Sequence, residues 1–151
     1  MKHLLVLLIS LILLFSCEGE KSNQNNDYPK SEQIISYFEN GNPRLVKTFI
    51  IKDGESITVY EKEYYEDSNV LKEGPIKNGK RDGLWKSFRS DGLLWSEGDY
   101  IEGVRDGITI TYHPNGNKYY EGHFSKGLKS GKWTFYNDEG MLLKEEDFDK
   151  K

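Results

Sequence analysis

A spacing of 24 residues organises the second half of this chain. Glycines recur at that interval in four series: Gly74, Gly98 and Gly122; Gly79, Gly103 and Gly127; Gly83, Gly107 and Gly131; and Gly92, Gly116 and Gly140. Aromatic residues keep the same register, as Phe88, Tyr112 and Tyr136 and as Tyr100, Phe124 and Phe148. A period of about 20–50 residues indicates a repeat architecture, in which each unit buries apolar surface only against its neighbours. The spacing therefore predicts an array of small units, not a domain around one enclosed core.

Each period reads as two strands separated by tight turns. Residues 84–89 and 93–101 are apolar-rich runs, with a turn signal at 90–92 between them and a glycine-bracketed loop at 102–107 after them. Asp-Gly and Asn-Gly pairs recur at the bends, and they supply the positive φ that hairpin turns require. We find no helical apolar periodicity after residue 17. The pattern predicts an all-β fold over residues 32–151, an elongated open antiparallel sheet of stacked β-hairpins, with the best repeats at 60–82, 83–106, 107–130 and 131–151.

This pattern resembles the MORN-repeat variant family of short β-hairpin repeats. The motif that carries the resemblance is Gly83-Leu84-Trp85-Lys86-Ser87-Phe88-Arg89-Ser90-Asp91-Gly92, then Glu97-Gly98-Asp99-Tyr100 and Gly103. The resemblance covers residues 83–148 well, 60–82 moderately and 32–59 poorly. The departures are Thr109 where Trp85 and Trp133 stand, Ser68 for a turn glycine and Glu146 for the second glycine. Some members are antitoxin components of toxin–antitoxin systems, so the resemblance leaves an antitoxin role open.

The start of the chain has the features of an exported lipoprotein. Lys2 and His3 precede an apolar run from Leu4 to Phe15, which is shorter than the roughly 20 residues of a membrane span and fits a secretory signal. Leu14-Phe15-Ser16-Cys17 resembles the bacterial lipobox, and Cys17 is the only cysteine. The resemblance implies a cleaved signal peptide at 1–16 and a Cys17 that is anchored in a lipid bilayer by two or more acyl chains. An ordinary secreted protein with a stray thiol is the alternative.

Residues 17–31 are mostly polar and lack periodicity, so we predict a flexible tether between Cys17 and the repeat domain. The acidic residues that follow Cys17 resemble the surface-export signals of some lipoproteins. The expected location is the cell envelope, with the outer membrane favoured over the inner membrane.

Four aromatic residues form a candidate binding strip: Trp85, Trp95, Tyr119 and Trp133. Exposed Trp and Tyr side chains are common anchors for a protein partner. The alternative is that these rings are the core of a thin sheet. In either case, the repeated glycines Gly98 and Gly122 are expected to leave room for a neighbouring ring to lie across the strand.

A second column is cationic and contains Arg81, Arg105 and Lys129. We expect these residues on one loop edge of the array, where they are candidates for binding anionic lipid. Because Asp82 and Asp106 sit beside two of them, solvated loop charges are the alternative.

A third column is acidic and contains Glu73, Glu97, Glu121 and Glu145. If neighbouring members lie two strands apart, about 9.6 Å, their repulsion in salt is only about 0.1 kcal/mol. An acid–base pair needs two different environments, whereas this column repeats one. We also find neither the histidine and cysteine spacing of a zinc site nor a nucleophile elbow. The sequence therefore predicts no enzyme, no catalytic residue, no metal and no cofactor.

These features favour a membrane-anchored, non-enzymatic module that binds a protein or another envelope component. An antitoxin-like immunity protein that neutralises a toxin is the first alternative, and a structural spacer without a ligand is the second. A formal net charge of −4 argues against nucleic acid as a partner.

Overall fold

The computed structural model describes residues 28–150. The predicted signal peptide at 1–16, Cys17 and most of the predicted tether lie outside the described residues. The strands are β1 Lys30–Tyr37, β2 Pro43–Lys52, β3 Glu55–Tyr64, β4 Val70–Lys77, β5 Lys80–Arg81, β6 Gly83–Phe88, β7 Leu94–Ile101, β8 Val104–Tyr112, β9 Lys118–Ser125, β10 Leu128–Tyr136 and β11 Leu142–Asp147. The strand β1 begins slightly ahead of the predicted domain start at residue 32.

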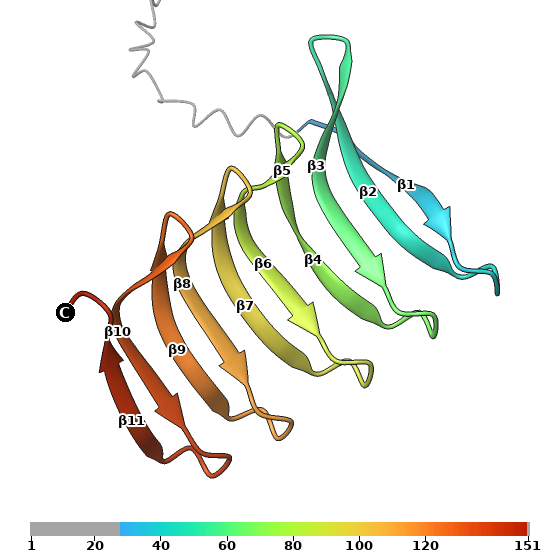
Figure 1. The fold of residues 1–151 in the computed structure, drawn as a ribbon. Coiled ribbons are helices and arrows are strands. Elements are labelled where there is room, and N and C mark those ends of the chain that lie inside the picture. The colour runs from blue at the N-terminus through green and yellow to red at the C-terminus, as the bar shows by residue number, and fades with distance from the viewer. Residues whose placement is uncertain (1–27, 151) are drawn as a thin grey trace, which may run out of the picture.

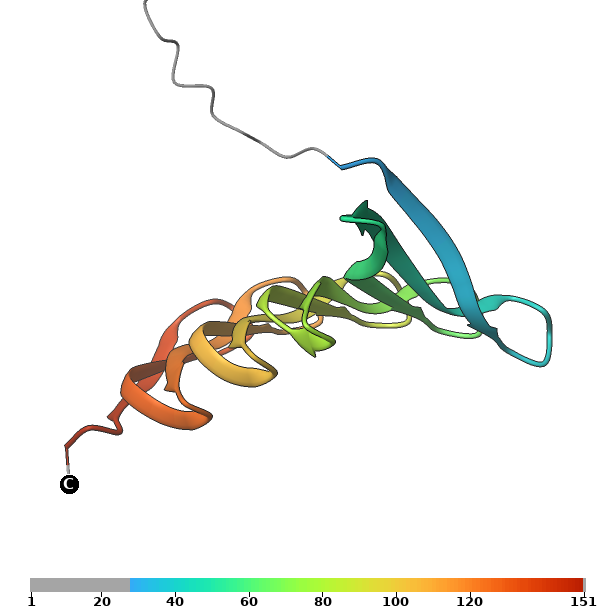
Figure 2. The same ribbon diagram turned by 90° about the horizontal axis from the view of Figure 1, so that it is seen from above.

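The strands form one antiparallel sheet in the order β1-β2-β3-β4-β6-β7-β8-β9-β10-β11, and the short β5 pairs with β4 outside this path. Each strand of the path pairs with the next, so the hairpins stack in sequence order from β1 at one end to β11 at the other (Figure 1). From above, the sheet is a single layer, with β1 at an angle to the rest of the array (Figure 2). The predicted fold, an open antiparallel sheet of stacked hairpins, is confirmed.

Two-residue turns close one edge of the array. In Asp53-Gly54, Asn78-Gly79, Glu102-Gly103 and Lys126-Gly127, the first residue has φ of 50–53° and the glycine 74–89°. Two successive positive φ angles are characteristic of the type I′ turn, whose twist matches a hairpin. Because two residues reverse the chain, pairing resumes at once and β8 begins at Val104. The expectation that all of 102–107 is a loop is therefore wrong.

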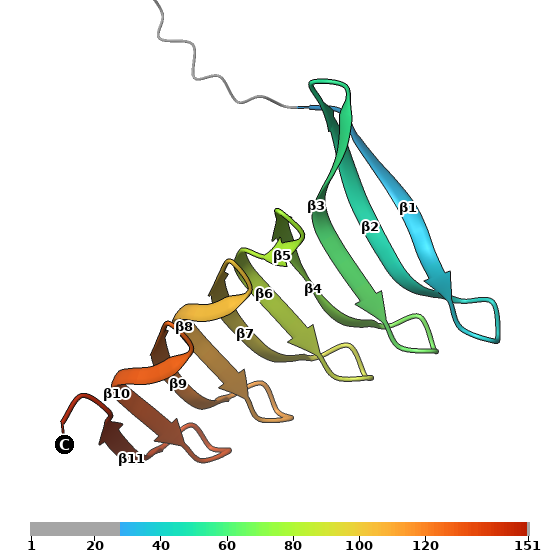
Figure 3. The ribbon, with the colours of Figure 1, turned by 45° about the horizontal axis from the view of Figure 1, so that its top comes forward.

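Longer turns at the opposite edge join the two strands of each hairpin, and the two-residue turns join each hairpin to the next. The Arg89 N–H donates to the Leu93 carbonyl at 2.8 Å, and the Gly92 N–H donates to the Arg89 carbonyl at 2.9 Å. The same pair of bonds recurs at Tyr65, His113 and Asn137. The Arg89 side chain also reaches the following unit, because its Nη2 donates to the Tyr112 carbonyl at 3.0 Å. Figure 3 shows these turns in a row along the lower edge.

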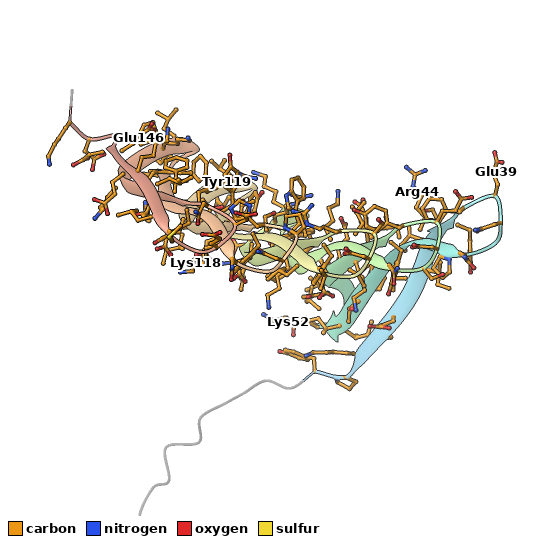
Figure 4. All side chains as sticks on the ribbon, turned by 90° about the horizontal axis from the view of Figure 1, so that it is seen from below. Glu39, Arg44, Lys52, Lys118, Tyr119 and Glu146 are labelled. Carbon is orange, nitrogen blue, oxygen red and sulfur yellow. The ribbon has the colours of Figure 1, made fainter. Side chains whose placement is uncertain are left out.

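The two faces of the sheet carry different side chains. Cross-strand pairing places Trp85, Gly98, Thr109, Gly122 and Trp133 on one face, which we call the tryptophan face. It places Lys86, Glu97, Ile110, Glu121 and Thr134 on the other, which we call the glutamate face. Figure 4 shows the alternation in β9, where the adjacent residues Lys118 and Tyr119 lie on opposite sides of the sheet.

The core of this thin sheet lies on the tryptophan face. Trp85 and Trp133 are 4% and 2% exposed, and Thr109 and Thr111 are also buried. A single layer buries large side chains only where neighbouring residues on the same face cover them. The core is therefore local, with one buried tryptophan in each of two hairpins, rather than one enclosed centre.

Candidate functional site

Glycines on the tryptophan face provide the seats for the two buried indole rings. A Cβ atom added to Gly74 would lie 2.5 Å from Cγ of Trp85, and one added to Gly122 would overlap Cδ2 of Trp133. Side chains do not approach that closely, so both positions require glycine. The predicted room for a ring is therefore confirmed at Gly122. At Gly98 no ring of this chain lies across the strand, because the facing residue is Thr109, whose Oγ1 would lie 3.1 Å from an added Cβ.

Equivalent hydrogen bonds hold the two tryptophans in place. The Nε1–H of Trp85 donates to the Pro75 carbonyl at 2.9 Å, and that of Trp133 donates to the His123 carbonyl at 3.2 Å. Trp133 also packs edge-on against Phe124, with ring centroids 5.2 Å apart. Two members of the candidate aromatic strip, Trp85 and Trp133, are thus core residues and are not available as an exposed binding surface.

The three predicted cations fold over the tryptophan face. The Arg81 guanidinium lies 4.1 Å from the centroid of the Trp85 ring, and Nζ of Lys129 lies 4.2 Å from that of Trp133. The third, Arg105, has no tryptophan beneath it and lies 5.2 Å from the Phe124 ring. A cation over an aromatic ring contributes about 0.5–1 kcal/mol at exposed sites. The cationic column thus covers the rings, in addition to whatever charge it presents to solvent.

Arg105 also contacts Tyr100, because its Nε donates to the Tyr100 hydroxyl at 3.1 Å. Burial raises the pKa of Tyr100, whereas the hydrogen bonds and charges of Arg105 and Arg81 lower it, and the net pKa lies below the ordinary value. The guanidinium groups thus favour the phenolate form of this tyrosine more than water does.

The other two members of the candidate strip, Trp95 and Tyr119, are exposed at 49% and 45%. In β7, Leu94 and Ser96 pair with successive residues of β6, which leaves Trp95 as the extra residue of a β-bulge. Tyr119 is the extra residue of the equivalent bulge in β9. A bulge redirects a side chain that regular alternation would place elsewhere. Both rings consequently stand out from the sheet as a repeated feature.

The same bulge occurs in the two flanking hairpins, where it carries leucine. The four bulge residues are Leu71, Trp95, Tyr119 and Leu143, which are spaced at the repeat interval on β4, β7, β9 and β11. We call this row the bulge stripe. Leu143 is 62% exposed, and single exposed leucines are common, but a regular row of four apolar residues is a candidate contact surface. The candidate strip predicted from the sequence did not include Leu71 and Leu143, although both lie at the 24-residue spacing from Trp95 and Tyr119.

Polar partners engage the glutamate column on the opposite face. The pairs are Lys62 with Glu73, Tyr112 with Glu97, Lys118 and Tyr136 with Glu121, and Lys132 with Glu145. Burial and the hydrogen bond to Glu97 raise the pKa of Tyr112 to about 12. The hydrogen bonds from Lys118 and Tyr136 lower the pKa of Glu121. At Glu97 and Glu121 the tyrosine that donates comes from the next hairpin, so these two carboxylates link neighbouring hairpins.

Comparison with known protein families identifies repeats in three segments of the array. The family model described as MORN repeat variant matches residues 52–78, 105–126 and 129–150. These three segments are MORN-variant repeats. The segment between the first two matches continues the same sheet, because β6 and β7 form a hairpin with the same turn bonds as its MORN-variant neighbours. No curated protein matches the chain.

Among residues 28–150, no cluster of three or more His, Cys, Asp or Glu side chains is arranged to hold a metal ion. Within the same range, no helix has the length and apolarity needed to cross a bilayer.

Proposed function

We propose that the chain is a lipid-anchored, non-enzymatic interaction module whose MORN-variant repeats present the bulge stripe to a protein partner. The observation that carries this proposal is the repeated exposure of an aromatic ring at the same bulge, in Trp95 and in Tyr119. Stability of the sheet does not require these rings outside, since Trp85 and Trp133 already supply the core. Exposed Trp and Tyr side chains bury much area at low entropic cost when a partner covers them.

The surroundings of the stripe suit a protein contact. Tyr119 packs against its neighbours, with its ring centroid 4.9 Å from that of His113 and 5.4 Å from that of Tyr120. These contacts hold the ring in one orientation before binding, which lowers the entropy that a partner must remove. The strand backbone behind the stripe is rigid on both sides, because β7 and β9 each pair with two neighbours.

The proposed anchor is Cys17, which would hold the module at the cell envelope through a short tether. A polar segment of about 14 residues has a root-mean-square reach of roughly 20 Å. That length would lift the repeats off the lipid headgroups and leave both faces of the sheet accessible.

The test is site-specific photo-crosslinking in intact cells. A photoreactive residue at position 119 should yield a discrete crosslinked product, and the substitution Trp95→Ala in the same chain should abolish it. The matched control carries the photoreactive residue at Ile108, which is 59% exposed on the glutamate face. No discrete product from position 119, or the same product from position 108, would refute the proposal.

A further inference from the structure

The junction between β7 and β8 lacks the aromatic residues that fill the equivalent space one repeat later, between β9 and β10. Where β9 pairs with β10, the tryptophan face carries three rings that pack together, Tyr120, Trp133 and Phe135, with centroids 5.5 and 6.0 Å from that of Tyr120. One repeat earlier, the corresponding residues are Ser96, Thr109 and Thr111. Three rings are thus replaced by three small hydroxyl side chains at one place in the array.

A cavity of about 170 Å³ occupies this place. Ser96, Thr109 and Thr111 all line it, and so does Gly98, the glycine that corresponds to the seats of the two buried tryptophans. Rings of the neighbouring units, Trp85 and Tyr120 among them, form its walls. A cavity of about 150 Å³ accepts a benzene ring in another protein, so this one has room for a single aromatic ring.

The groups that hold Trp133 have counterparts around the cavity. Trp133 packs against Phe124 and Phe148 and lies under Lys129. The counterparts of that pair of rings, one repeat earlier, are Tyr100 and Phe124, and the counterpart of Lys129 is Arg105. The Arg105 guanidinium already lies 6.0 Å from the Tyr100 ring and 5.2 Å from the Phe124 ring, without an indole beneath it.

Thr109 does not substitute for the missing ring. Its hydroxyl donates to the Glu97 carbonyl at 3.2 Å and lies against Gly98, where it would meet an added Cβ at 3.1 Å. This small side chain covers the glycine but leaves the space between Ser96, Thr111 and Arg105 unfilled. The carbonyl that would correspond to the indole acceptors Pro75 and His123 belongs to Asp99. Flanking rings, a cation and a glycine seat therefore surround a vacant position, which we call the indole slot and define by Ser96, Gly98, Thr109 and Thr111.

We propose that the indole slot binds one aromatic side chain, a tryptophan, of a polypeptide partner, which packs beside Thr109, between Ser96 and Thr111, and stacks against Arg105. This inference rests on the proposed function, and it adds the partner group that the module recognises. The slot suits a polypeptide because Trp95 of the bulge stripe lines it. A partner that covers the stripe could therefore insert a side chain into the slot from the same surface.

The first experiment uses N-acetyl-L-tryptophanamide as the probe and the full chain as the receptor, with amide NMR shifts as the readout. We expect saturable shifts at Gly98 and Thr111, with a dissociation constant on the order of a millimolar, the range of a one-ring fragment. The substitution Thr109→Trp should fill the slot with the chain's own ring and weaken probe binding at least tenfold. Ser96→Tyr, which copies Tyr120, fills the slot independently if the first variant fails to fold. The matched control, Ile108→Trp, adds the same ring to the opposite face and should leave binding unchanged.

The outcomes separate this inference from the proposed function. No saturable shift in the wild type, or equal binding to Thr109→Trp and the wild type, would overturn the slot even if the crosslink from position 119 is found. Free indole that binds while N-acetyl-L-tryptophanamide does not would overturn the assignment to a polypeptide. Probe binding without any crosslink would refute the proposed function, and with it the partner for the slot.

Discussion

Substitution of Gly122 by alanine should destabilise the array far more than the same substitution at Gly98. Both glycines lie on the tryptophan face at the same repeat position, and neither has a positive φ. A methyl group at Gly122 would overlap the ring of Trp133, whereas at Gly98 its nearest neighbour would be Oγ1 of Thr109 at 3.1 Å, with no atom closer than that. The difference in free energy of unfolding between the two variants therefore reports the clash with the Trp133 ring rather than a backbone preference.

The magnitude follows from the burial of Trp133, which is 2% exposed. Full expulsion of a tryptophan exposes about 150–250 Å², which at about 25 cal/mol per Å² corresponds to about 4–6 kcal/mol. Overpacking that only tilts the ring costs about 1–3 kcal/mol. We expect Gly122→Ala to lower the free energy of unfolding by about 2–5 kcal/mol, within these two limits. At about 4 °C per kcal/mol, the melting temperature should fall by about 8–20 °C.

The assay is denaturant and thermal unfolding followed by circular dichroism. Gly98→Ala should stay within about 1 kcal/mol of the wild type, because the lost freedom of the unfolded chain offsets a mild contact. In a Trp133→Thr background, Gly122→Ala should cost less than about 0.5 kcal/mol, so the coupling energy should be about 1.5 kcal/mol or more. The reasoning would be refuted if alanine at Gly122 and at Gly98 lowered the free energy of unfolding equally. It would also be refuted if Gly122→Ala were as destabilising in the Trp133→Thr background as in the wild type.

Three further predictions concern other parts of the chain. Because the pKa of Tyr112 is raised from 10.0 to about 12, the stability contributed by its bond to Glu97 is complete below pH 10 and is lost as the pH rises toward 12. Denaturant unfolding of Tyr112→Phe and the wild type should therefore differ most below pH 10 and converge near pH 12, and a gap that does not change with pH would contradict this. Lys129→Ala should lower the free energy of unfolding by about 0.5–1 kcal/mol, while Lys129→Arg should keep the contact with the Trp133 ring; identical losses in both variants would exclude it. Cys17→Ala should move the chain from the membrane to the soluble fraction and abolish metabolic acyl labelling, and unchanged partitioning and labelling would exclude a lipid anchor at this residue.

Much of the fold could be predicted because its determinants are local. The Asn78-Gly79 pair specifies a tight turn through the conformations that its own residues allow. The 24-residue spacing then transfers that turn and its flanking strands to each later unit. The loop predicted at 102–107 is wrong for the same local reason, because Glu102 adopts a φ of 50° and completes a two-residue turn with Gly103.

The candidate site was predictable only in part. The spacing identified Trp85, Trp95, Tyr119 and Trp133 as a set but did not say which of them are buried. The structure separates them, because Trp85 and Trp133 lie over glycines whereas Trp95 and Tyr119 lie in bulges. A bulge inserts one residue into the pairing register and reverses the side on which later side chains project. Pairing of that kind involves a second strand, so it is not encoded in the spacing of one strand alone.

The sequence by itself determined the repeat, the turns and the order of the hairpins, since each depends on residues close together in the chain or on their fixed interval. Only the tertiary structure decided which column of side chains becomes core and which becomes surface. The sequence shows that Thr109 stands where the repeat register has Trp85 and Trp133. Only the structure shows that a cavity results at this place. The physical reason is that a cavity depends on what surrounds the smaller side chain, and here the surrounding rings and Arg105 come from neighbouring hairpins.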